Sequence, residues 1–183
     1  ARLPALDSEP PRPSGPCSDS RCHLCRSLMG TKKVKSTSYG DIHNCKNSGT
    51  HCNSGNVVYC IQCLDCDKQY VGSTTLPLRQ RINNHKSCIR RAKNGSLQDT
   101  DCFELYRHLA EHSDGQFRLM ILEEVTPATV NRIIRKRKLV TMDPETALRK
   151  VERDWITDLG TVTPMGLNMN NGKGSQFRKK RKK

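Results

Sequence analysis

The chain has 183 residues, which is enough for one ordinary domain with appendages but not for two domains of equal size. Its 32 Lys and Arg residues against 18 Asp and Glu residues give a formal charge of +14, which favours a polyanionic partner such as nucleic acid. No stretch is apolar for long enough to span a bilayer, so we expect no membrane association.

The ten cysteines indicate either disulfides in a secreted protein or metal ligands in a reducing compartment. Several of them form C-x2-C pairs and have histidines nearby, which favours zinc. The first residues are polar and proline-rich, unlike an apolar signal segment, so secretion has no support. A start at alanine instead of methionine suggests a fragment of a longer protein.

Two segments without regular periodicity come first. Residues 1–16 carry five prolines and are predicted to be a disordered linker. Residues 17–56 begin with Cys17, Cys22 and Cys25 in the spacing C-x4-C-x2-C, and end with a second group that includes Cys52. This part has too few apolar residues to fold by burial alone, so we expect a zinc-binding linker segment.

The remaining elements follow in the order β-β-α-α-β-α-α. Strands are predicted at 57–63 (VVYCIQC), 68–71 and 117–123, and helices at 77–92, 101–112, 127–140 and 144–159. Proline at the start of three of these helices supports their boundaries. The order predicts an α+β fold, with a small three-stranded mixed or antiparallel sheet flanked by helices.

Two polar side chains are predicted on the buried face of the first helix. At about 100° per residue, Arg81 and His85 share a sector with Leu78, Ile82 and Ile89. Burying an arginine and a histidine costs desolvation energy. Either each has a buried partner and a structural role, or the two form part of a functional site.

The last helix repeats this anomaly with a carboxylate. Its apolar stripe comprises Leu148, Val151, Trp155, Ile156 and Leu159. Glu152 projects into the middle of that stripe. A structural salt bridge with Arg81 is one explanation, and a phosphate and metal site formed with Arg81 and His85 is the other. The spacing leaves both open.

Five short motifs occur in a fixed order. They are Val57-Val58-Tyr59, Tyr70-Val71-Gly72, Arg81 eleven residues after Tyr70, Glu152 in VERDWITDL, and Gly166-Leu167-Asn168. Together they resemble the GIY-YIG nuclease family, over about 110 of the 183 residues. The first motif has valines where the family has Gly and Ile, but keeps the tyrosine. The resemblance implies a GIY-YIG nuclease domain at 57–168.

Within this family, the chain is most similar to the endonuclease domain of Penelope-like retroelements, which has a C-x2-C pair between the two tyrosine motifs. Cys63 and Cys66 occupy that position, and His108 and His112 lie one helical turn apart on one face. This set predicts a tetrahedral zinc site. The alternative makes the cysteines small core residues and the histidines surface groups, and Cys60 shows that the spacing also arises by coincidence.

The upstream cysteines need a fourth ligand for zinc. Cys17, Cys22 and Cys25 supply three, and Cys52 is favoured because it stands just before the first strand, as in that retroelement family. Competing ligands remain open, namely His23, His43, Cys45 and His51. Cys88 and Cys102 fit neither site.

The resemblance also assigns roles in phosphodiester hydrolysis. Glu152 would hold one catalytic Mg²⁺, and Arg81 would bind the phosphate. Tyr59, assisted by His85 or Tyr70, would orient or deprotonate the attacking water. Unaided, a tyrosine has a pKa of roughly 10 and is a poor base. Asn168 would brace the site.

The partners expected from charge and resemblance are nucleic acids. Seven basic residues within the tail at 169–183, Lys173 and Arg178 to Lys183, would contact DNA phosphates or serve as a nuclear localisation signal. The retroelement resemblance implies an upstream reverse transcriptase in the same polypeptide, a template RNA, a nuclear location and nicking that primes integration. A repair or recombination nuclease and a catalytically inactive zinc-dependent nucleic-acid-binding module are the alternatives.

Overall fold

The computed structural model describes residues 14–97 and 102–170. Most of the predicted linker (residues 1–13) and most of the predicted basic tail (171–183) lie outside the described residues. The strands are β1 (Leu28–Met29), β2 (Lys33–Lys35), β3 (Ile42–Asn44), β4 (Val57–Cys63), β5 (Gln69–Thr74) and β6 (Phe117–Glu124). The helices are α1 (Leu78–Lys93), α2 (Phe103–Glu111), α3 (Pro127–Arg137) and α4 (Pro144–Leu159), with a short 3-10 helix, η1 (Ser113–Gly115).

The main sheet has four strands in the order β1-β6-β4-β5. The three predicted strands form β4, β5 and β6, which pair antiparallel with β4 in the centre. The predicted number of strands was wrong, because β1 adds a fourth that runs parallel to β6. Two residues are too few for a periodic pattern, so the sequence does not signal this strand. β2 and β3 form a separate antiparallel pair.

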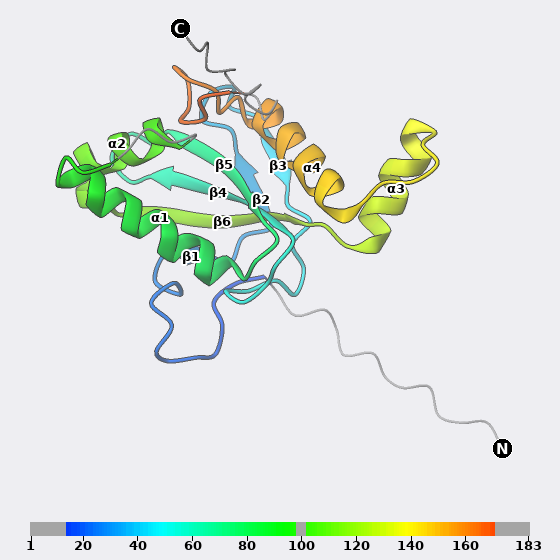
Figure 1. Ribbon diagram of the computed structural model, residues 1–183, viewed down its shortest axis with the longest axis horizontal. Coiled ribbons are helices and arrows are strands. Elements are labelled where there is room, and N and C mark those ends of the chain that lie inside the picture. Colours follow the sequence, from blue (N-terminus) through cyan, green and yellow to red (C-terminus); the bar gives the residue numbers. More distant parts are fainter. Residues whose placement is uncertain (1–13, 98–101, 171–183) are drawn as a thin grey trace, which may run out of the picture.

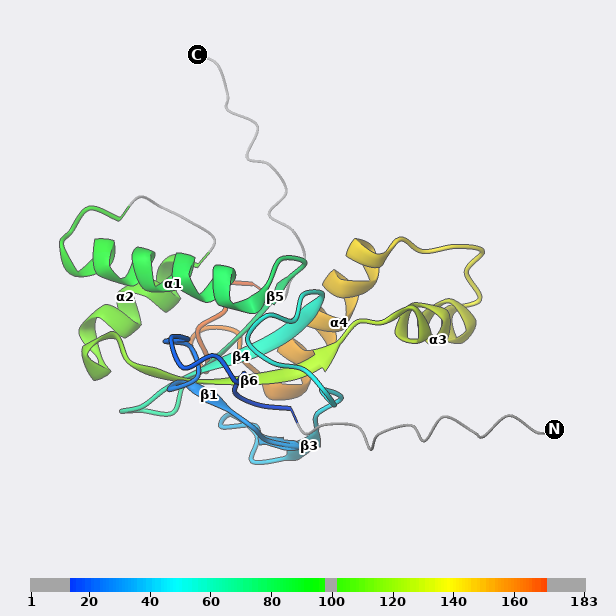
Figure 2. The same ribbon diagram turned by 90° about the horizontal axis from the view of Figure 1, so that it is seen from below.

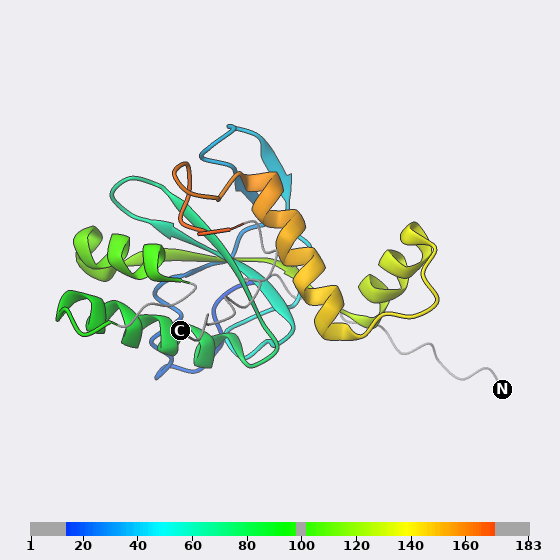
Figure 3. The ribbon, with the colours of Figure 1, turned by 45° about the horizontal axis from the view of Figure 1, so that its top comes forward.

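Helices cover both faces of this sheet, which confirms the α+β class. α1 and α2 lie on one face and α4 crosses the other (Figures 1 and 3). Alternate residues of β4 therefore enter two different cores. Tyr59 and Ile61 pack towards α1 and α2, whereas Val58 and Cys60 pack towards α4. Because β4 is buried on both sides, its sequence is a nearly continuous apolar run instead of an alternation of apolar and polar residues.

Capping residues set the ends of the two later helices. Pro127 and Pro144 occupy the first turn of α3 and α4, and Asp143 accepts a hydrogen bond from the Thr146 amide at 2.9 Å. α3 ends at Arg137, three residues earlier than predicted, because Lys138 takes a left-handed conformation that closes the helix. The helix has no buried residue and stands at the periphery beyond α4 (Figure 1).

The cysteine-rich segment packs against the sheet. Leu24 and Leu28 are buried in the core under α1 and α2, and Val34 is buried in the core under α4. The Lys46 amide also donates to the Leu122 carbonyl at 2.7 Å. Figure 2 shows the segment running along β6 and β4. Its few apolar residues thus join the two cores on either side of the sheet.

Within the described ranges, none of the helices combines the length and apolar character that crossing a membrane requires.

Candidate active site and metal centres

A glycine on the edge strand creates the space in which the two predicted tyrosines meet. Gly72 of β5 pairs with Tyr59 of β4. A Cβ atom at Gly72 would lie 2.7 Å from the Tyr59 hydroxyl oxygen and 2.8 Å from Cε1 of Tyr70. Such contacts are shorter than van der Waals packing allows, so the glycine is required for both phenol rings to occupy this position. A bulge between Val58 and Tyr59 marks the same point of β4.

The first turns of α1 bring Arg81 and His85 to this hydroxyl. His85 Nε2 lies 2.7 Å from the Tyr59 hydroxyl oxygen, and Arg81 Nε donates to the same oxygen at 3.2 Å. Both residues face inward, as the helical projection predicts, and His85 is almost fully buried. The phenol is therefore held from two sides. Because Arg81 uses only its Nε atom in this bond, its terminal nitrogens can face a substrate.

Burial controls the protonation of this group. It lowers the pKa of His85 to about 3, and the neighbouring Arg81 charge adds to the shift, so the imidazole is neutral near pH 7. Burial also raises the pKa of Tyr59, and the Arg81 guanidinium only partly opposes that effect. Tyr59 is therefore a protonated phenol beside a neutral imidazole.

Two further side chains complete the hydrogen-bonded group, and the sequence pattern assigned neither of them. Tyr106 of α2 places its hydroxyl 3.0 Å from His85 Nδ1, and Cys102 places its Sγ 3.2 Å from the Tyr70 hydroxyl. A tyrosine among buried residues on α2 was the available signal for Tyr106. The sequence carries no such signal for Cys102, because this residue fits no metal-ligand spacing.

Glu152 reaches the same edge from the opposite face of the sheet. The Ser73 hydroxyl, next to Gly72, donates to Glu152 Oε2 at 3.0 Å. No ion pair joins the described side chains of Glu152 and Arg81, so the structural salt bridge considered from the sequence is absent. Burial raises the pKa of Glu152, although Ser73 and the nearby Arg81 charge oppose the shift. The carboxylate is thus half-buried without a directly paired cation.

Asn168 binds the backbone of the edge strand, and among the described residues its side-chain hydrogen bonds go to Val71 and Thr161. Its Nδ2 donates to the Val71 carbonyl at 2.8 Å, and its Oδ1 accepts from the Val71 amide at 2.9 Å and from Thr161 Oγ1 at 2.7 Å. The side chain therefore occupies the place of a neighbouring strand beside β5. It fixes the backbone next to Gly72.

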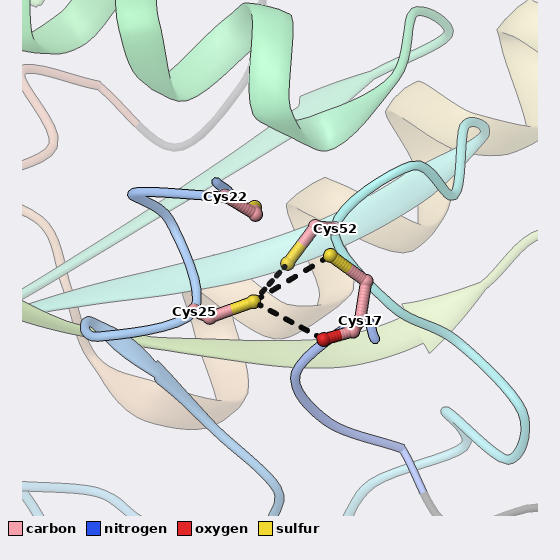
Figure 4. A group of neighbouring side chains, drawn as sticks. All are labelled: Cys17, Cys22, Cys25 and Cys52. Atoms are coloured by element: carbon pink, nitrogen blue, oxygen red, sulfur yellow. Dashed lines mark hydrogen bonds between the residues drawn. The ribbon is translucent and has the colours of Figure 1, made fainter. Parts of the chain in front are cut away.

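The upstream cysteines form one compact group. The ligand atoms of Cys17, Cys22, Cys25 and Cys52 lie within 4.8 Å of one another, and Figure 4 shows them converging from separate loops. Cys25 Sγ is 3.5 Å from Cys17 Sγ and 3.6 Å from Cys52 Sγ. A disulfide needs about 2.05 Å, whereas a tetrahedron with Zn–S bonds of about 2.3 Å needs roughly 3.8 Å. The spacing fits a metal.

The competing ligands for the fourth position lie outside this group. Among the described residues, only Cys52 joins the three predicted cysteines, and none of His23, His43, Cys45 and His51 does.

The second group joins the β4–β5 hairpin to α2. Ligand atoms of Cys63, Cys66, His108 and His112 also lie within 4.8 Å of one another. Cys66 Sγ is 3.2 Å from His108 Nε2, and the two imidazole rings stack with centroids 4.2 Å apart. Burial and the adjacent His112 lower the pKa of His108, which favours the neutral imidazole that binds metal. Cysteine and histidine donors suit zinc.

Comparison with known proteins supports a nuclease domain. Residues 55–138 match the family model of the GIY-YIG catalytic domain. This match supports a GIY-YIG nuclease domain in this part of the chain. No curated protein and no solved structure matches. The matched range includes Tyr59, Tyr70, Arg81 and His85, whereas Glu152 and Asn168 lie beyond it. The position of those two residues at the same strand edge therefore rests on the structure.

Both metal groups brace the elements that carry the GIY-YIG residues. The Cys52 carbonyl accepts from the Arg79 amide at 2.8 Å, so the first group holds the beginning of α1. His108 lies two residues after Tyr106, so the second group holds the helix whose tyrosine contacts His85. A metal at either position would therefore fix a helix that carries candidate active-site residues as well as a loop.

Proposed function

We propose that this chain is a metal-dependent DNA endonuclease that nicks one strand by phosphodiester hydrolysis. The proposal is carried by one observation, the convergence of Tyr59, Arg81, His85 and Glu152 around the edge strand at Gly72. Tyr59, Arg81 and His85 lie on one face of the sheet and Glu152 on the other, and both sets flank the edge strand β5. The GIY-YIG match supports the same assignment.

Glu152 is suited to hold the divalent ion. Its carboxylate is half-buried, and its one direct side-chain partner among the described residues is the Ser73 hydroxyl. An acidic oxygen ligand without a competing ammonium or guanidinium suits Mg²⁺, which accepts a single carboxylate and keeps several waters. When bound, the ion would supply positive charge that acidifies a water molecule and stabilises charge on the phosphate.

The hydrogen bonds also define a path for the proton of the attacking water. Neutral His85 carries its proton on Nδ1 when it donates to the Tyr106 hydroxyl, which leaves Nε2 to accept from Tyr59. Tyr59 would pass its phenolic proton to Nε2 while its oxygen takes a proton from water. The resulting hydroxide attacks phosphorus, and the bond to the leaving sugar oxygen breaks. Solvent protonates that oxygen, and the His85 imidazolium releases its proton to solvent, which restores the neutral ring.

Arg81 binds the phosphate in this scheme. Its Nε is used by Tyr59, so the two terminal nitrogens can donate to phosphoryl oxygens as negative charge builds in the transition state. The same residue therefore couples the position of the substrate to the position of the phenol. Tyr70, beside His85 in a T-shaped arrangement with ring centroids 6.0 Å apart, packs this group in place.

We further propose structural zinc at both cysteine groups. Metal analysis of the purified chain should find two equivalents of zinc. Cys52→Ser should remove one equivalent and His112→Ala the other, because each variant breaks one group and leaves its counterpart intact. Zinc absent from the native chain, or lost from both sites in either variant, would contradict two independent sites.

The biological role proposed from the sequence resemblance is retroelement integration. In that role, the nick primes reverse transcription at the target by an upstream reverse transcriptase in the same polypeptide, with a template RNA, in the nucleus. The two metal groups favour this reading over a repair or recombination nuclease, which would lack the paired cysteines and histidines. The inward-facing Glu152 and Arg81 favour catalysis over an inactive binding module.

A plasmid assay tests the chemistry. The zinc-loaded chain should convert supercoiled plasmid to the nicked form with Mg²⁺, and Glu152→Ala should abolish nicking while DNA binding and zinc content persist. Full cleavage by Glu152→Ala would refute the mechanism. A zinc-loaded native chain that binds DNA but never nicks it would instead support the inactive binding module.

A further inference from the structure

A basic groove lies along one flank of α1, between that helix, the cysteine-rich segment and the start of β6. Five cationic side chains from these three elements line it, namely Arg26, Lys86, Arg90, Lys93 and Arg118. The amides of Asn83 and Gln116 add neutral hydrogen-bond donors. Arg26 comes from the cysteine-rich segment and Lys86, Arg90 and Lys93 come from α1, so two separate parts of the chain line the groove.

Three of the five cations lack an acidic partner. Lys93 bonds to Asp114 at 2.5 Å, and Arg118 lies 3.7 Å from Asp67. No carboxylate of the described residues forms an ion pair with Arg26, Lys86 or Arg90. Asp114, already bound by Lys93, is the one acidic residue on the groove wall within the described ranges. The groove therefore presents uncompensated positive charge, and the complementary ligand is an anion.

The groove and the catalytic group occupy opposite sides of the buried stripe of α1. At about 100° per residue, Lys86 and Arg90 are rotated by roughly 100° or more from Arg81 and His85 around the helix axis. Ile82 and Ile89, which are buried, lie between the two sets. The groove cations are therefore separate from the phosphate-binding arginine of the proposed reaction.

The length of the groove fits a polymer better than a single phosphate. Asn83 and Lys93 are ten residues apart, which corresponds to about 15 Å along a helix that rises 1.5 Å per residue. Successive phosphates of one DNA strand advance by about 3.4 Å along the duplex axis. The cations on α1, from Lys86 to Lys93, span about 10 Å of that length, which corresponds to about three phosphate-to-phosphate advances.

We infer that this groove binds the phosphate backbone of duplex DNA flanking the cleavage position. This inference rests on the proposed nuclease function. A helix with its side chains is about 10–12 Å across, so phosphates held in the groove lie at least three or four base pairs from the scissile one. The groove then holds the substrate in register without taking part in the chemistry.

Binding measurements on the zinc-loaded full chain test this inference. Lys86→Gln with Arg90→Gln removes two groove charges, and Lys33→Gln with Arg91→Gln removes two exposed charges that do not line the groove. Affinity for a 30-base-pair duplex would be measured without Mg²⁺ at several salt concentrations. The groove variant should lose about tenfold in affinity and about two units of salt slope, whereas the control should keep the native slope.

A nicking assay locates the contact relative to the cleaved bond. On long DNA the groove variant should show a KM raised about tenfold with unchanged kcat. On duplexes shortened to fewer than about three base pairs on the side of the cleaved bond that faces the groove, the groove has no phosphates to bind. The KM of the native chain should then rise to that of the groove variant. Equal slopes for the groove and control variants, or a lower kcat with unchanged KM, would overturn the inference.

A third variant guards against misfolding of the α1 double variant, and an RNA ligand tests whether the groove binds RNA instead of duplex DNA. Arg26→Gln lies outside α1 and should lower the salt slope by about one unit even if the α1 double variant fails to fold. Loss of affinity for single-stranded RNA with duplex DNA binding unchanged would also overturn the inference. A native chain that binds DNA through the groove but never nicks it would refute the proposed nuclease function alone.

Discussion

Glu123 on β6 and Glu152 on α4 differ in how many side chains donate hydrogen bonds or ion pairs to their carboxylates. Glu123 of β6 is buried, and its carboxylate accepts from Arg132 at 2.8 Å, from the Trp155 indole at 3.1 Å and from Lys46 at 3.3 Å. Glu152 lies one turn before Trp155 on α4 and has the Ser73 hydroxyl as its direct side-chain partner among the described residues. The more buried acid has more partners.

The difference separates a structural carboxylate from one available for chemistry. Burying a charge is costly unless partners replace the lost hydration, and Glu123 has two cations and an indole for that purpose. Glu152 has no cation in direct contact, so burial raises its pKa. A fold retains such a group at a cost in stability when function needs it. Four predictions test this contrast, from the largest effect to the smallest.

Removing the charge of Glu152 should have the largest effect, and the effect should be on catalysis. Glu152→Gln should lower the rate of Mg²⁺-dependent nicking on the order of 10³-fold, since a metal contributes several kcal/mol to transition-state stabilisation. Asp158→Asn, an exposed position on the same helix, is the matched control and should nick at the native rate. Single-turnover kinetics would measure both. Comparable losses in the two variants would remove Glu152 from the site.

Removing the charge of Glu123 should affect stability and spare catalysis. Glu123→Gln should lower the free energy of unfolding by about 2–3 kcal/mol, because Arg132 and Lys46 lose their shared partner but are half-exposed and can be rehydrated. Glu124→Gln, at the next residue, is the control. Urea denaturation would give both values. A stability loss for Glu124→Gln as large as that for Glu123→Gln would contradict the contrast.

The pH dependence of stability should reflect the burial of Glu152. The folded pKa of Glu152 is raised by burial, so its contribution to stability is present at low pH and is lost as the pH rises through that pKa. Without Mg²⁺, Glu152→Gln should therefore be slightly more stable than the native chain at pH 7. The difference should vanish below about pH 4, where glutamate is protonated in both states. Thermal unfolding of the zinc-loaded native chain and of Glu152→Gln across this pH range would measure the difference. A native chain more stable than the variant at pH 7 would contradict the prediction.

The smallest effect is expected at the hydroxyl that orients Glu152. Ser73→Ala removes a hydrogen bond of 3.0 Å but leaves the carboxylate in place. The Mg²⁺ concentration for half-maximal nicking should rise a few-fold, in line with about 1 kcal/mol for one such bond, while the maximal rate stays near native. Magnesium titrations of the two proteins would show this. A lost maximal rate would give Ser73 a larger part in the reaction.

Local patterns predicted much of the fold and of the candidate site. A run of β-branched and aromatic residues located β4, and helical periodicity located α1 and α4 and the inward projection of Arg81, His85 and Glu152. Periodicity could not locate β1, which has two residues, or the early end of α3 at Lys138. Both depend on contacts or backbone conformations that a single segment does not encode.

The residues that sequence reasoning missed share one property. The hydrogen-bond partners of Tyr106, Cys102 and Ser73 lie 21, 32 and 79 positions away in the chain, respectively. Glu123 was seen as part of a strand, and its three partners come from three separate elements. Hydrogen bonds between distant segments leave no periodic trace, so spacing alone could not identify these groups.

By itself, the sequence determined the residue types, the faces of the helices and the spacing of the cysteine and histidine ligands, because each follows from the local repeat of a helix, a strand or a short loop. Only the tertiary structure decided that Cys52 joins the upstream cysteines, that Arg81 binds Tyr59 in place of Glu152, and that Glu123 is neutralised while Glu152 is not. These outcomes depend on which surfaces pack together, because burial then lowers the pKa of His85 and raises that of Glu152.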